Sequence, residues 1–201
     1  MSNFPNPRKL LLASGNPGKL KEYQTLSDGA DRRWQLELLS SYSSVPEFEE
    51  SAPTFAENSA GKAIYYSKLS GEVVFADDSG LVVPALNGAP GVLSARYAGP
   101  SATNDQKIAK LVDEMKDFDQ ANRSACFVCV ITAAQRGSVL AVVSEKVDGV
   151  ILDSPRGTGG FGYDPIFFFP KLGKTFAELS REEKNLYSHR GKAFRRLLEI
   201  L

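Results

Sequence analysis

Glycines, aromatic rings and a carboxylate are concentrated in one short segment of the chain. Residues 157–165 read GTGGFGYDP. Glycines let backbone N–H groups approach a ligand closely, in conformations that other residues rarely adopt. The rings of Phe161 and Tyr163 offer faces on which a nucleobase could stack. A hairpin connection between two strands has a similar composition, but the combination also predicts a site for a flat, phosphorylated ligand.

A pair of acidic residues follows another apolar segment. Asp77 and Asp78 come after a predicted strand over residues 72–76 and precede Ser79 and Gly80. Open α/β sheets usually bind ligands at the carboxyl ends of their strands. Because side chains alternate along a strand, we expect one carboxylate to face the site and the other to brace the loop or to contact a metal ion through water. Ser79 offers its hydroxyl to a phosphate, although an Asp-Asp-Ser-Gly sequence is also typical of a simple turn.

A third segment, SGNPGK at residues 14–19, predicts an anion site. It follows a predicted buried strand over residues 8–13 and opens a helix near Lys19. Asn16 can cap this helix, and Pro17 suits its first position. The free N–H groups and the positive end of the helix dipole would then point at a phosphate.

Oxygen ligands for a divalent cation can come from an acidic segment before the second predicted helix. Glu47, Glu49 and Glu50 precede the second predicted helix. A capping box that begins at Thr54 marks the start of this helix. One of these carboxylates could join Asp78 around Mg²⁺, which takes oxygen ligands and commonly bridges one or two carboxylates to substrate phosphates. The remaining glutamates are then solvated.

Lys19 at the first predicted helix, with Lys184 and Arg190 near the C-terminus, could supply positive charge for a polyphosphate. Lys184 and Arg190 lie in a predicted helical region that Ser180 caps, together with His189. His189 is the only histidine of the chain, and a lone histidine is more often structural than catalytic. On an unbroken helix His189 would lie about 140° from Lys184. We therefore predict a helix break near Ser188, which would let both side chains face one ligand.

Three apparent motif matches are rejected. Residues 157–162 match the dinucleotide fingerprint as text, but an apolar strand follows where a helix is required. The segment 14–19 lacks the spacing of a P-loop, so hydrolysis of the terminal phosphate of ATP or GTP has no motif behind it. Cys126 and Cys129 have the spacing of a redox or metal pair, but strand alternation points them to opposite faces, and we expect buried, reduced thiols.

The overall composition excludes a strong global field. The 201 residues include 24 Lys and Arg and 24 Asp and Glu, for a formal net charge of +0. This balance provides nothing to hold the protein on nucleic acid or an anionic membrane, so we expect neither partner. No apolar run reaches the roughly 18 residues of a membrane span, and the first nine residues do not resemble a signal peptide. We expect a cytoplasmic protein.

The order of the predicted elements indicates an α/β protein. Strands are predicted at residues 8–13, 36–39, 72–76, 124–134, 139–151 and 166–169, with a small hairpin at 81–88. Helices are predicted from residue 19, at 54–69, at 103–118 and beyond 180, and residues 90–100 are predicted to form a surface loop or lid. Helices interleaved with strands, together with an antiparallel pair over 124–151, predict a mixed central β-sheet flanked by helices. We expect one folded domain over residues 1–201, with two lobes and the active-site cleft between them.

Six short motifs are spread over nearly the whole chain. They are SGNPGK at 14–19, TFAEN at 54–58, ADDSGL at 76–81, PG at 90–91 with SARY at 94–97, FGYDP at 161–165 and SHR at 188–190. Together they resemble the Ham1/RdgB family of inosine and xanthosine triphosphate pyrophosphatases. The resemblance implies a homodimer with an elongated mixed sheet. It also implies Mg²⁺-dependent hydrolysis of ITP, dITP and XTP to the nucleoside monophosphate and pyrophosphate.

The resemblance further implies roles for individual residues. Asp78 would be the catalytic carboxylate close to Mg²⁺, and Glu49, followed by Glu47, is the first choice for the second metal carboxylate, with Glu50 and Asp77 left open. The implied substrate-binding residues are Ser14, Gly15, Asn16, Pro17, Gly18, Lys19, Ser79, Phe161, Gly162, Tyr163, Asp164, Lys184, His189 and Arg190. Those from Ser14 to Lys19 would hold the triphosphate.

The chemistry of pyrophosphate release agrees with these residue types. Water must attack the α-phosphorus, so Asp78 would orient or deprotonate this water while Mg²⁺ and the basic side chains stabilise the leaving group. Hypoxanthine and xanthine carry an acceptor oxygen at position 6, where adenine carries an amino donor. Donors from His189, Arg190 or the backbone would therefore reject adenine. The basis for rejecting guanine, and the preference among ITP, dITP and XTP, stay open.

Two alternative functions were weighed against this one. A Maf-type nucleotide pyrophosphatase also begins with a strand and a small phosphate-contacting loop, but that loop usually has an arginine pair that this chain lacks. A noncatalytic nucleotide sensor would not need a carboxylate such as Asp78 beside Lys19 and Ser79.

Overall fold

A computed structural model describes residues 8–28, 33–39 and 47–201 of the chain. The chain divides into two compact units. Unit 1 comprises Met1–Asp78, Val130–Ser144 and Lys192–Leu201, and unit 2 comprises Ser79–Cys129 and Glu145–Gly191. The prediction that the active site lies in a cleft between two lobes stays a prediction.

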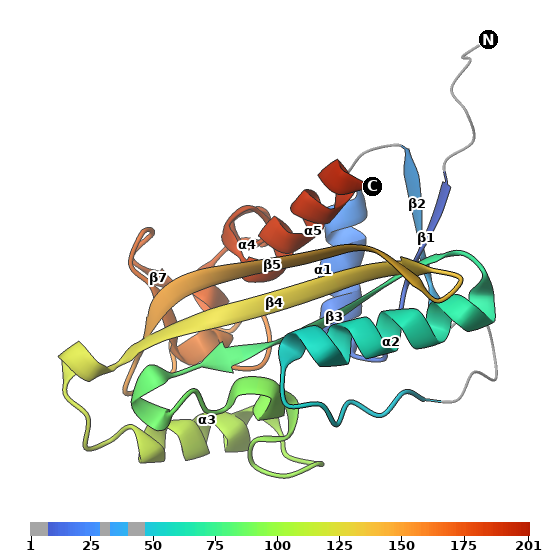
Figure 1. Cartoon of the computed structure of the whole chain (residues 1–201). Coiled ribbons are helices and arrows are strands. Elements are labelled where there is room, and N and C mark those ends of the chain that lie inside the picture. Colours follow the sequence, from blue (N-terminus) through green and yellow to red (C-terminus); the bar gives the residue numbers. More distant parts are fainter. Residues whose placement is uncertain (1–7, 29–32, 40–46) are drawn as a thin grey trace. The chain divides into compact units, whose positions relative to one another are not determined.

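Within the described residues, seven strands belong to one mixed sheet. They are β1 (Arg8–Leu12), β2 (Trp34–Leu38), β3 (Val73–Val82), β4 (Ser124–Gln135), β5 (Ser138–Ile151), β6 (Phe167–Phe169) and β7 (Lys174–Thr175), in the order β2-β1-β3-β4-β5-β6-β7 (Figure 1). β1 is parallel to β2 and β3, whereas β6 is antiparallel to β5 and β7. The predicted α/β class with a mixed central sheet is therefore confirmed.

The α-helices of the described residues are α1 (Pro17–Asp28), α2 (Phe55–Ser70), α3 (Asn104–Glu114), α4 (Arg181–Tyr187) and α5 (His189–Ile200). Helices α1, α2 and α4 begin at the predicted caps Asn16, Thr54 and Ser180. The side chains of Thr54, Thr103 and Ser180 each accept a hydrogen bond from the backbone N–H three residues later. Ser188 is extended, with ψ 153, so the predicted break between α4 and α5 is confirmed. Over the ranges that the structure describes, no helix combines the length and apolar character needed to span a membrane.

In unit 1, the side chains of β3 alternate between two helical layers. Phe75 packs edge-to-face against Tyr23 of α1, with ring centroids 5.1 Å apart, and Tyr23 also contacts Phe194 of α5 at 5.2 Å. Val74 belongs to a different core cluster that includes Ala63 of α2. Because a strand has a period of two, odd-numbered positions up to 77 face α1 and α5, and even-numbered positions up to 78 face α2.

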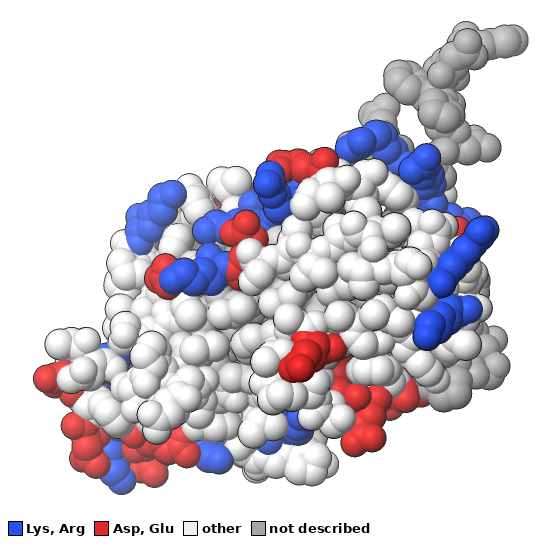
Figure 2. Space-filling view, in the orientation of Figure 1, with Lys and Arg blue, Asp and Glu red and all other residues white. Residues whose placement is uncertain are grey.

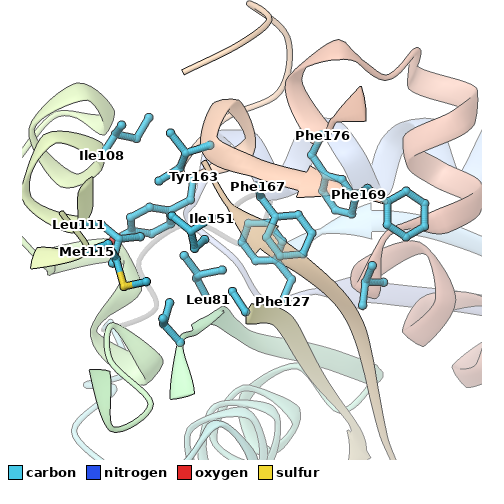
Figure 3. Packing of buried hydrophobic residues seen from close by; sticks show 14 residues of the cluster. Leu81, Ile108, Leu111, Met115, Phe127, Ile151, Tyr163, Phe167, Phe169 and Phe176 are labelled. Carbon is cyan, nitrogen blue, oxygen red and sulfur yellow. The ribbon is translucent and has the colours of Figure 1, made fainter. Parts of the chain in front are cut away.

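The core of unit 2 is rich in aromatic residues. The ring centroids of Phe127 and Phe167 are 4.4 Å apart, and those of Phe167 and Phe176 are 4.9 Å apart. Tyr163 belongs to the same cluster, where Figure 3 shows its ring beside Leu111. This core therefore holds one end of the glycine-rich segment 157–165 in place.

A two-residue hairpin joins the two longest strands. Arg136 and Gly137 connect β4 to β5 with φ values of 51 and 83. Positive φ at both central residues is the geometry of a type I′ turn, so the predicted pairing of neighbouring antiparallel strands is confirmed. Cys126 and Cys129 of β4 are free thiols; Cys129 is buried as predicted, whereas Cys126 is half-buried.

The strand predicted at 72–76 is longer than expected. β3 continues through Asp77 and Asp78 to Val82, so the competing interpretation of these residues as a turn is wrong. The strand is extended because Leu81, next to its end, is fully buried in the core of unit 2. Both aspartates are thus held by regular strand geometry rather than by a loop.

The segment after β3 also differs from the prediction. Residues 81–88 do not form a small hairpin of two strands: they include the 3₁₀ helix η2 (Pro84–Leu86) and one isolated bridge, between Val82 and Pro90. Residues 90–100 contain the 3₁₀ helix η3 (Gly91–Arg96) rather than an open loop. The buried Ser94 hydroxyl accepts a hydrogen bond from the Leu81 N–H at 2.9 Å, which ties η3 to the end of β3. Strand β7 and its position next to β6 were missed because two residues carry no periodic signal.

A buried arginine links three parts of unit 2. The guanidinium of Arg123 donates hydrogen bonds to the carbonyl oxygens of Met115, Phe118 and Ile151, at 2.8, 3.2 and 3.5 Å. It also forms an ion pair with Asp153 at 2.6 Å, whose side chain is 65% exposed. The Arg123 side chain therefore donates hydrogen bonds to backbone carbonyl groups after α3 and at the end of β5.

We expect Arg123→Ala to lower the free energy of unfolding by about 3 kcal/mol, because it leaves buried carbonyl groups without hydrogen bonds. Urea denaturation followed by circular dichroism measures the change. Asp153→Ala is the matched control, and should change stability by less than about 1 kcal/mol, because the Asp153 carboxylate is largely exposed to solvent and Arg123 keeps its three carbonyl partners. Equal effects of the two substitutions would show that the carbonyl contacts are not what stabilises this region.

Candidate active site

Basic side chains do not form one continuous area on the face of the molecule shown in Figure 2. Lys and Arg lie there in separate groups, several of them next to Asp or Glu. This agrees with the formal net charge of +0. An anionic ligand must therefore be held by local groups rather than by a general field.

The segment 14–19 forms the N-terminus of α1, as predicted. The side-chain oxygen of Asn16 accepts hydrogen bonds from the N–H groups of Gly18 and Lys19, at 2.9 and 3.2 Å, so Asn16 is the cap. The hydroxyl of Ser14 accepts a hydrogen bond from the Asn16 N–H at 3.3 Å. Gly15 and Asn16 are exposed. A phosphate at this end of α1 would be stabilised by the helix dipole.

Lys19 forms a buried ion pair with Asp77. Its Nζ lies 2.9 Å from Oδ2 of Asp77 and donates a hydrogen bond to the backbone oxygen of the same residue at 3.3 Å. The Asp77 side chain is 0% exposed and that of Lys19 is 12% exposed. Asp77 therefore fixes the position of the Lys19 ammonium group, and it does so from a strand rather than from the loop that we expected one aspartate to brace.

Asp78 lies on the other face of β3 and has different surroundings. Its Oδ2 accepts a hydrogen bond from the side-chain amide of Asn58 at 3.0 Å, and the residue is 6% exposed. Burial raises the pKa of Asp78 above its ordinary value of 3.8, and the charges of Glu50 and Asp77 raise it further, while Lys19 and the Asn58 hydrogen bond oppose the shift. The result is a carboxylate that binds a proton, or a cation, more readily than an exposed one.

The acidic segment 47–50 places its glutamates differently from one another. Glu47 and Glu49 are exposed. Glu50 is half-buried, forms an ion pair with the buried Lys62 of α2, and is the glutamate whose charge acts on Asp78. Among the described residues, no group of three or more His, Cys, Asp and Glu side chains is placed to hold a metal ion by itself.

In unit 2, a buried ion pair shapes the glycine-rich segment. Oδ2 of Asp164 accepts hydrogen bonds from the Phe161 N–H at 2.7 Å and from the ammonium of Lys184 at 2.5 Å. Gly160 has a φ of 70, and a Cβ at this position would lie 2.0 Å from the Asp164 carboxylate. Asp164 therefore acts within the loop, holding its backbone and positioning Lys184.

Two basic residues lie over the ring of Phe161. The Lys184 ammonium is 4.8 Å and the Arg190 guanidinium 5.5 Å from the ring centroid. Arg190 also donates a hydrogen bond to the hydroxyl of Ser79 at 2.9 Å. Phe161 is partly exposed. Unit 2 thus brings together an aromatic ring, two positive charges and a hydroxyl, which are groups that bind a nucleotide.

His189 and Tyr163 have their rings in the interior of unit 2. His189 stacks on Phe127 with ring centroids 4.8 Å apart and an interplanar angle of 10°. Tyr163 is 4% exposed, and its hydroxyl donates a hydrogen bond to the backbone oxygen of Ser94 at 3.0 Å. The expectation that the Tyr163 ring offers a stacking face is therefore wrong, because packing in the core uses this ring. Of the two aromatic residues in the glycine-rich segment, Phe161 has the partly exposed ring.

Sequence reasoning missed two polar residues beside Asp78 and Glu50. Asn58 and Lys62 are buried on α2, at 2% and 7% exposure. Their spacing of four residues puts them on one face of the helix. The spacing alone did not identify them, because their burial depends on the tertiary structure.

Known proteins resemble this chain over nearly its whole length. The model of the Ham1 family matches residues 10–200. Curated dITP/XTP pyrophosphatases from Geobacter sulfurreducens and Thermus thermophilus are 45% and 48% identical to this chain; they match 96% and 95% of it and 96% and 90% of their own lengths. A solved structure of a HAM1 protein from Coxiella burnetii is 41% identical, covers 96% of this chain and 98% of that one, and superposes with a TM-score of 0.84. The buried carboxylate on β3, the capped loop before α1 and the glycine-rich segment therefore occur in a chain that belongs to the Ham1 family.

Proposed function

We propose that this chain hydrolyses noncanonical purine nucleoside triphosphates such as ITP, dITP and XTP to the monophosphate and pyrophosphate. The observation that carries the proposal is the buried Asp78 carboxylate, with its raised pKa, in the same unit as the Lys19 ammonium and the N-terminus of α1. Relatives that are 45% and 48% identical are named dITP/XTP pyrophosphatases. Together they support a pyrophosphohydrolase that acts on the bond between the α- and β-phosphates.

Asp78 is the group best suited to act on water. In the proposed reaction a water oxygen bonds to the α-phosphorus, the bond from this phosphorus to the bridging oxygen breaks, and pyrophosphate leaves. The water must lose a proton, and Asp78 orients the water and accepts this proton. A raised pKa makes an ionised carboxylate a stronger base. Asp77 cannot share this role equally, because its carboxylate is engaged by Lys19.

The remaining charged groups bind the substrate in this proposal. The α1 N-terminus and Lys19 stabilise the negative charge of the triphosphate. Ser79 provides a hydroxyl for phosphate oxygens, and Arg190 and Lys184 provide two positive charges for them. Phe161 provides a surface on which the base can stack. Asp78 and Ser79, which have different tasks in this proposal, are consecutive residues of β3.

Mg²⁺ fits the residues around Asp78. Mg²⁺ is usually bound through one or two carboxylates, keeps several waters and takes further oxygens from substrate phosphates, so a cage of three protein ligands is not required. Asp78 and Glu50 would hold the ion, because both carry oxygen donors and the charge of Glu50 already acts on Asp78. A bound Mg²⁺ would neutralise charge on the phosphate oxygens. We therefore assign the second metal carboxylate to Glu50 in preference to Glu49 or Glu47.

Selection for keto-purines requires hydrogen-bond donors near position 6 of the base. His189 and Arg190 are the candidates; they are the first two residues of α5, and both belong to unit 2. An adenine amino group facing these donors would leave buried polar groups without partners, and such mismatches produce large discrimination. We further propose a homodimer that acts on the cytoplasmic nucleotide pool, as the family resemblance implies.

Incubation with Mg²⁺ and ITP should yield IMP and pyrophosphate, with dITP and XTP also cleaved and with ATP and dTTP poor substrates. Ion-exchange chromatography and a pyrophosphate assay identify the products. Asp78→Asn should lower kcat by about 10³-fold, the scale of losing a general base. Asp105→Asn, an exposed carboxylate on α3, is the control and should retain activity. Release of orthophosphate, rapid cleavage of ATP or dTTP, or an active Asp78→Asn variant would each contradict the proposal.

The same substitution should make the protein more stable. A carboxyl group whose pKa is raised in the folded state binds more protons there than in the unfolded state, so stability falls as pH rises from 3.8 through the folded pKa. Asp78→Asn removes the ionisable group, and at pH 7.5 with a chelator present we expect a Tm about 2–4 °C higher. The pH dependence of Tm should also be flatter than in the wild type. Calorimetry at several pH values makes the measurement, and a lower Tm for Asp78→Asn would show that Asp78 is not strained by burial.

The three glutamates of the acidic segment can be compared directly. Glu50→Gln should raise the Mg²⁺ concentration needed for half-maximal rate by about 10-fold or more, because it removes a charge that acts at Asp78. Glu49→Gln and Glu47→Gln are matched controls with exposed side chains and should change this concentration less than about twofold. Initial rates over a Mg²⁺ titration give the values. A large effect of Glu49→Gln alone would restore Glu49 as the metal carboxylate.

A further inference from the structure

The side-chain amide of Asn58 is buried at the start of α2. The residue is 2% exposed and lies four residues after Thr54, the N-cap of the helix. Its backbone N–H donates a hydrogen bond to the Thr54 carbonyl at 3.2 Å, so the helical turn that carries it is fixed. The amide therefore projects from a rigid part of unit 1.

The Asn58 amide connects two segments of unit 1. Its Oδ1 accepts a hydrogen bond from the Ala52 N–H at 2.9 Å, and its Nδ2 donates to the Ala52 carbonyl at 3.2 Å. The same Nδ2 donates to Oδ2 of Asp78 at 3.0 Å. One orientation of the amide satisfies all three contacts, because a flipped amide would set its oxygen against the Ala52 carbonyl and the Asp78 carboxylate.

The segment that Asn58 holds also carries Glu50. Ala52 lies two residues after Glu50, and Glu50 forms an ion pair with Lys62, one helical turn after Asn58 on α2. Phe48 is attached to the same helix, since its N–H donates to the Tyr66 hydroxyl at 3.0 Å. The acidic segment is therefore fastened to α2 at several points, and one of them, Asn58, also contacts Asp78.

We propose that Asn58 is a positioning residue that fixes the Asp78 carboxylate relative to the segment carrying Glu50, so that the two carboxylates can serve one divalent cation. The inference rests on the proposed function, because it gives Asp78 and Glu50 a shared task. Asn58 itself is assigned no contact with substrate or metal. Its effect comes through the carboxylate oxygen that it holds and through the backbone of Ala52.

Kinetics separate positioning from substrate binding. Asn58→Ala should lower kcat for ITP by about 10–100-fold and raise the Mg²⁺ concentration for half-maximal rate, as is typical when a residue that orients a metal ligand is lost. KM for ITP should stay within about threefold, because no phosphate or base contact is removed. Asn122→Ala is the control: Asn122 is an exposed asparagine, and its amide contacts Asp119. It should behave as the wild type.

Two measurements with a chelator present test the inference without activity. Hydrogen exchange, read by mass spectrometry, should become faster over residues 47–53 in Asn58→Ala than in the wild type and the Asn122→Ala control. The second measurement is a double-mutant cycle on Tm. Asn58→Asp keeps the side-chain shape but sets a carboxylate against Asp78, whereas in the Asp78→Asn background the new amide can donate to it. The loss of Tm should therefore be about 2–4 °C smaller in that background.

The outcomes distinguish the inference from the proposed function. If the wild type does not cleave ITP, the proposed function fails, and exchange and the Tm cycle still show whether Asn58 joins the two segments. A higher KM with an unchanged kcat in Asn58→Ala would assign Asn58 to substrate binding and overturn the inference. Unchanged exchange over residues 47–53, or additive Tm changes in the cycle, would overturn it as well.

Discussion

The alternation of side chains along β3 is the constraint on which the site of unit 1 depends. Phe75 contacts Tyr23 of α1, and two residues later Asp77 pairs with Lys19 of the same helix. On the opposite face, Asp78 accepts a hydrogen bond from Asn58 of α2. The apolar packing of the strand thus decides which helix each carboxylate meets. Because β3 is a regular strand at these positions, neither aspartate can exchange its role with the other.

Two adjacent carboxylates acquire different properties from these contacts. Burying a carboxylate away from water is unfavourable unless a charge or hydrogen bonds compensate. Asp77 has a cation within 2.9 Å, whereas Asp78 has a neutral amide, and burial raises the pKa of Asp78. Pairs of acidic groups in contrasting environments are typical of sites where one group carries the chemistry and the other positions its neighbours. Glu50, which pairs with Lys62 of α2, adds to this contrast because its negative charge raises the pKa of Asp78 further.

In unit 2, the buried ion pair between Asp164 and Lys184 holds the glycine-rich segment 157–165. Glycines dominate residues 157–162, yet the segment has defined anchors: Asp164 holds the Phe161 N–H and the Lys184 ammonium, and the Tyr163 ring is packed in the core. The Phe161 ring is left partly exposed with two cations over it. Glycine provides the necessary backbone conformations, since Gly160 and Gly162 have φ values of 70 and 62. The aromatic and charged residues then limit that freedom to one arrangement.

The amino-acid sequence by itself determined the features that depend on neighbours a few residues away. The Asn16, Thr54 and Ser180 caps and the helix break at Ser188 were predicted because each is stabilised by hydrogen bonds within about one helical turn. The mixed α/β sheet followed from the hydrophobic periodicity of its longer strands. The family resemblance, which rests on six motifs in one order, implied roles for residues of the candidate site before any contact between them was known.

Only the tertiary structure decided how those residues are used. The pairs that define the site are far apart in the chain: Asn58 and Asp78 are separated by 20 residues, Lys19 and Asp77 by 58, and Ser79 and Arg190 by 111. No local pattern reports that Glu50 acts on Asp78, that Tyr163 lies in a core, or that Asn58 faces a carboxylate. These facts depend on burial and on the approach of separate elements, and a side chain's pKa and partners are properties of that packed environment rather than of its sequence neighbours.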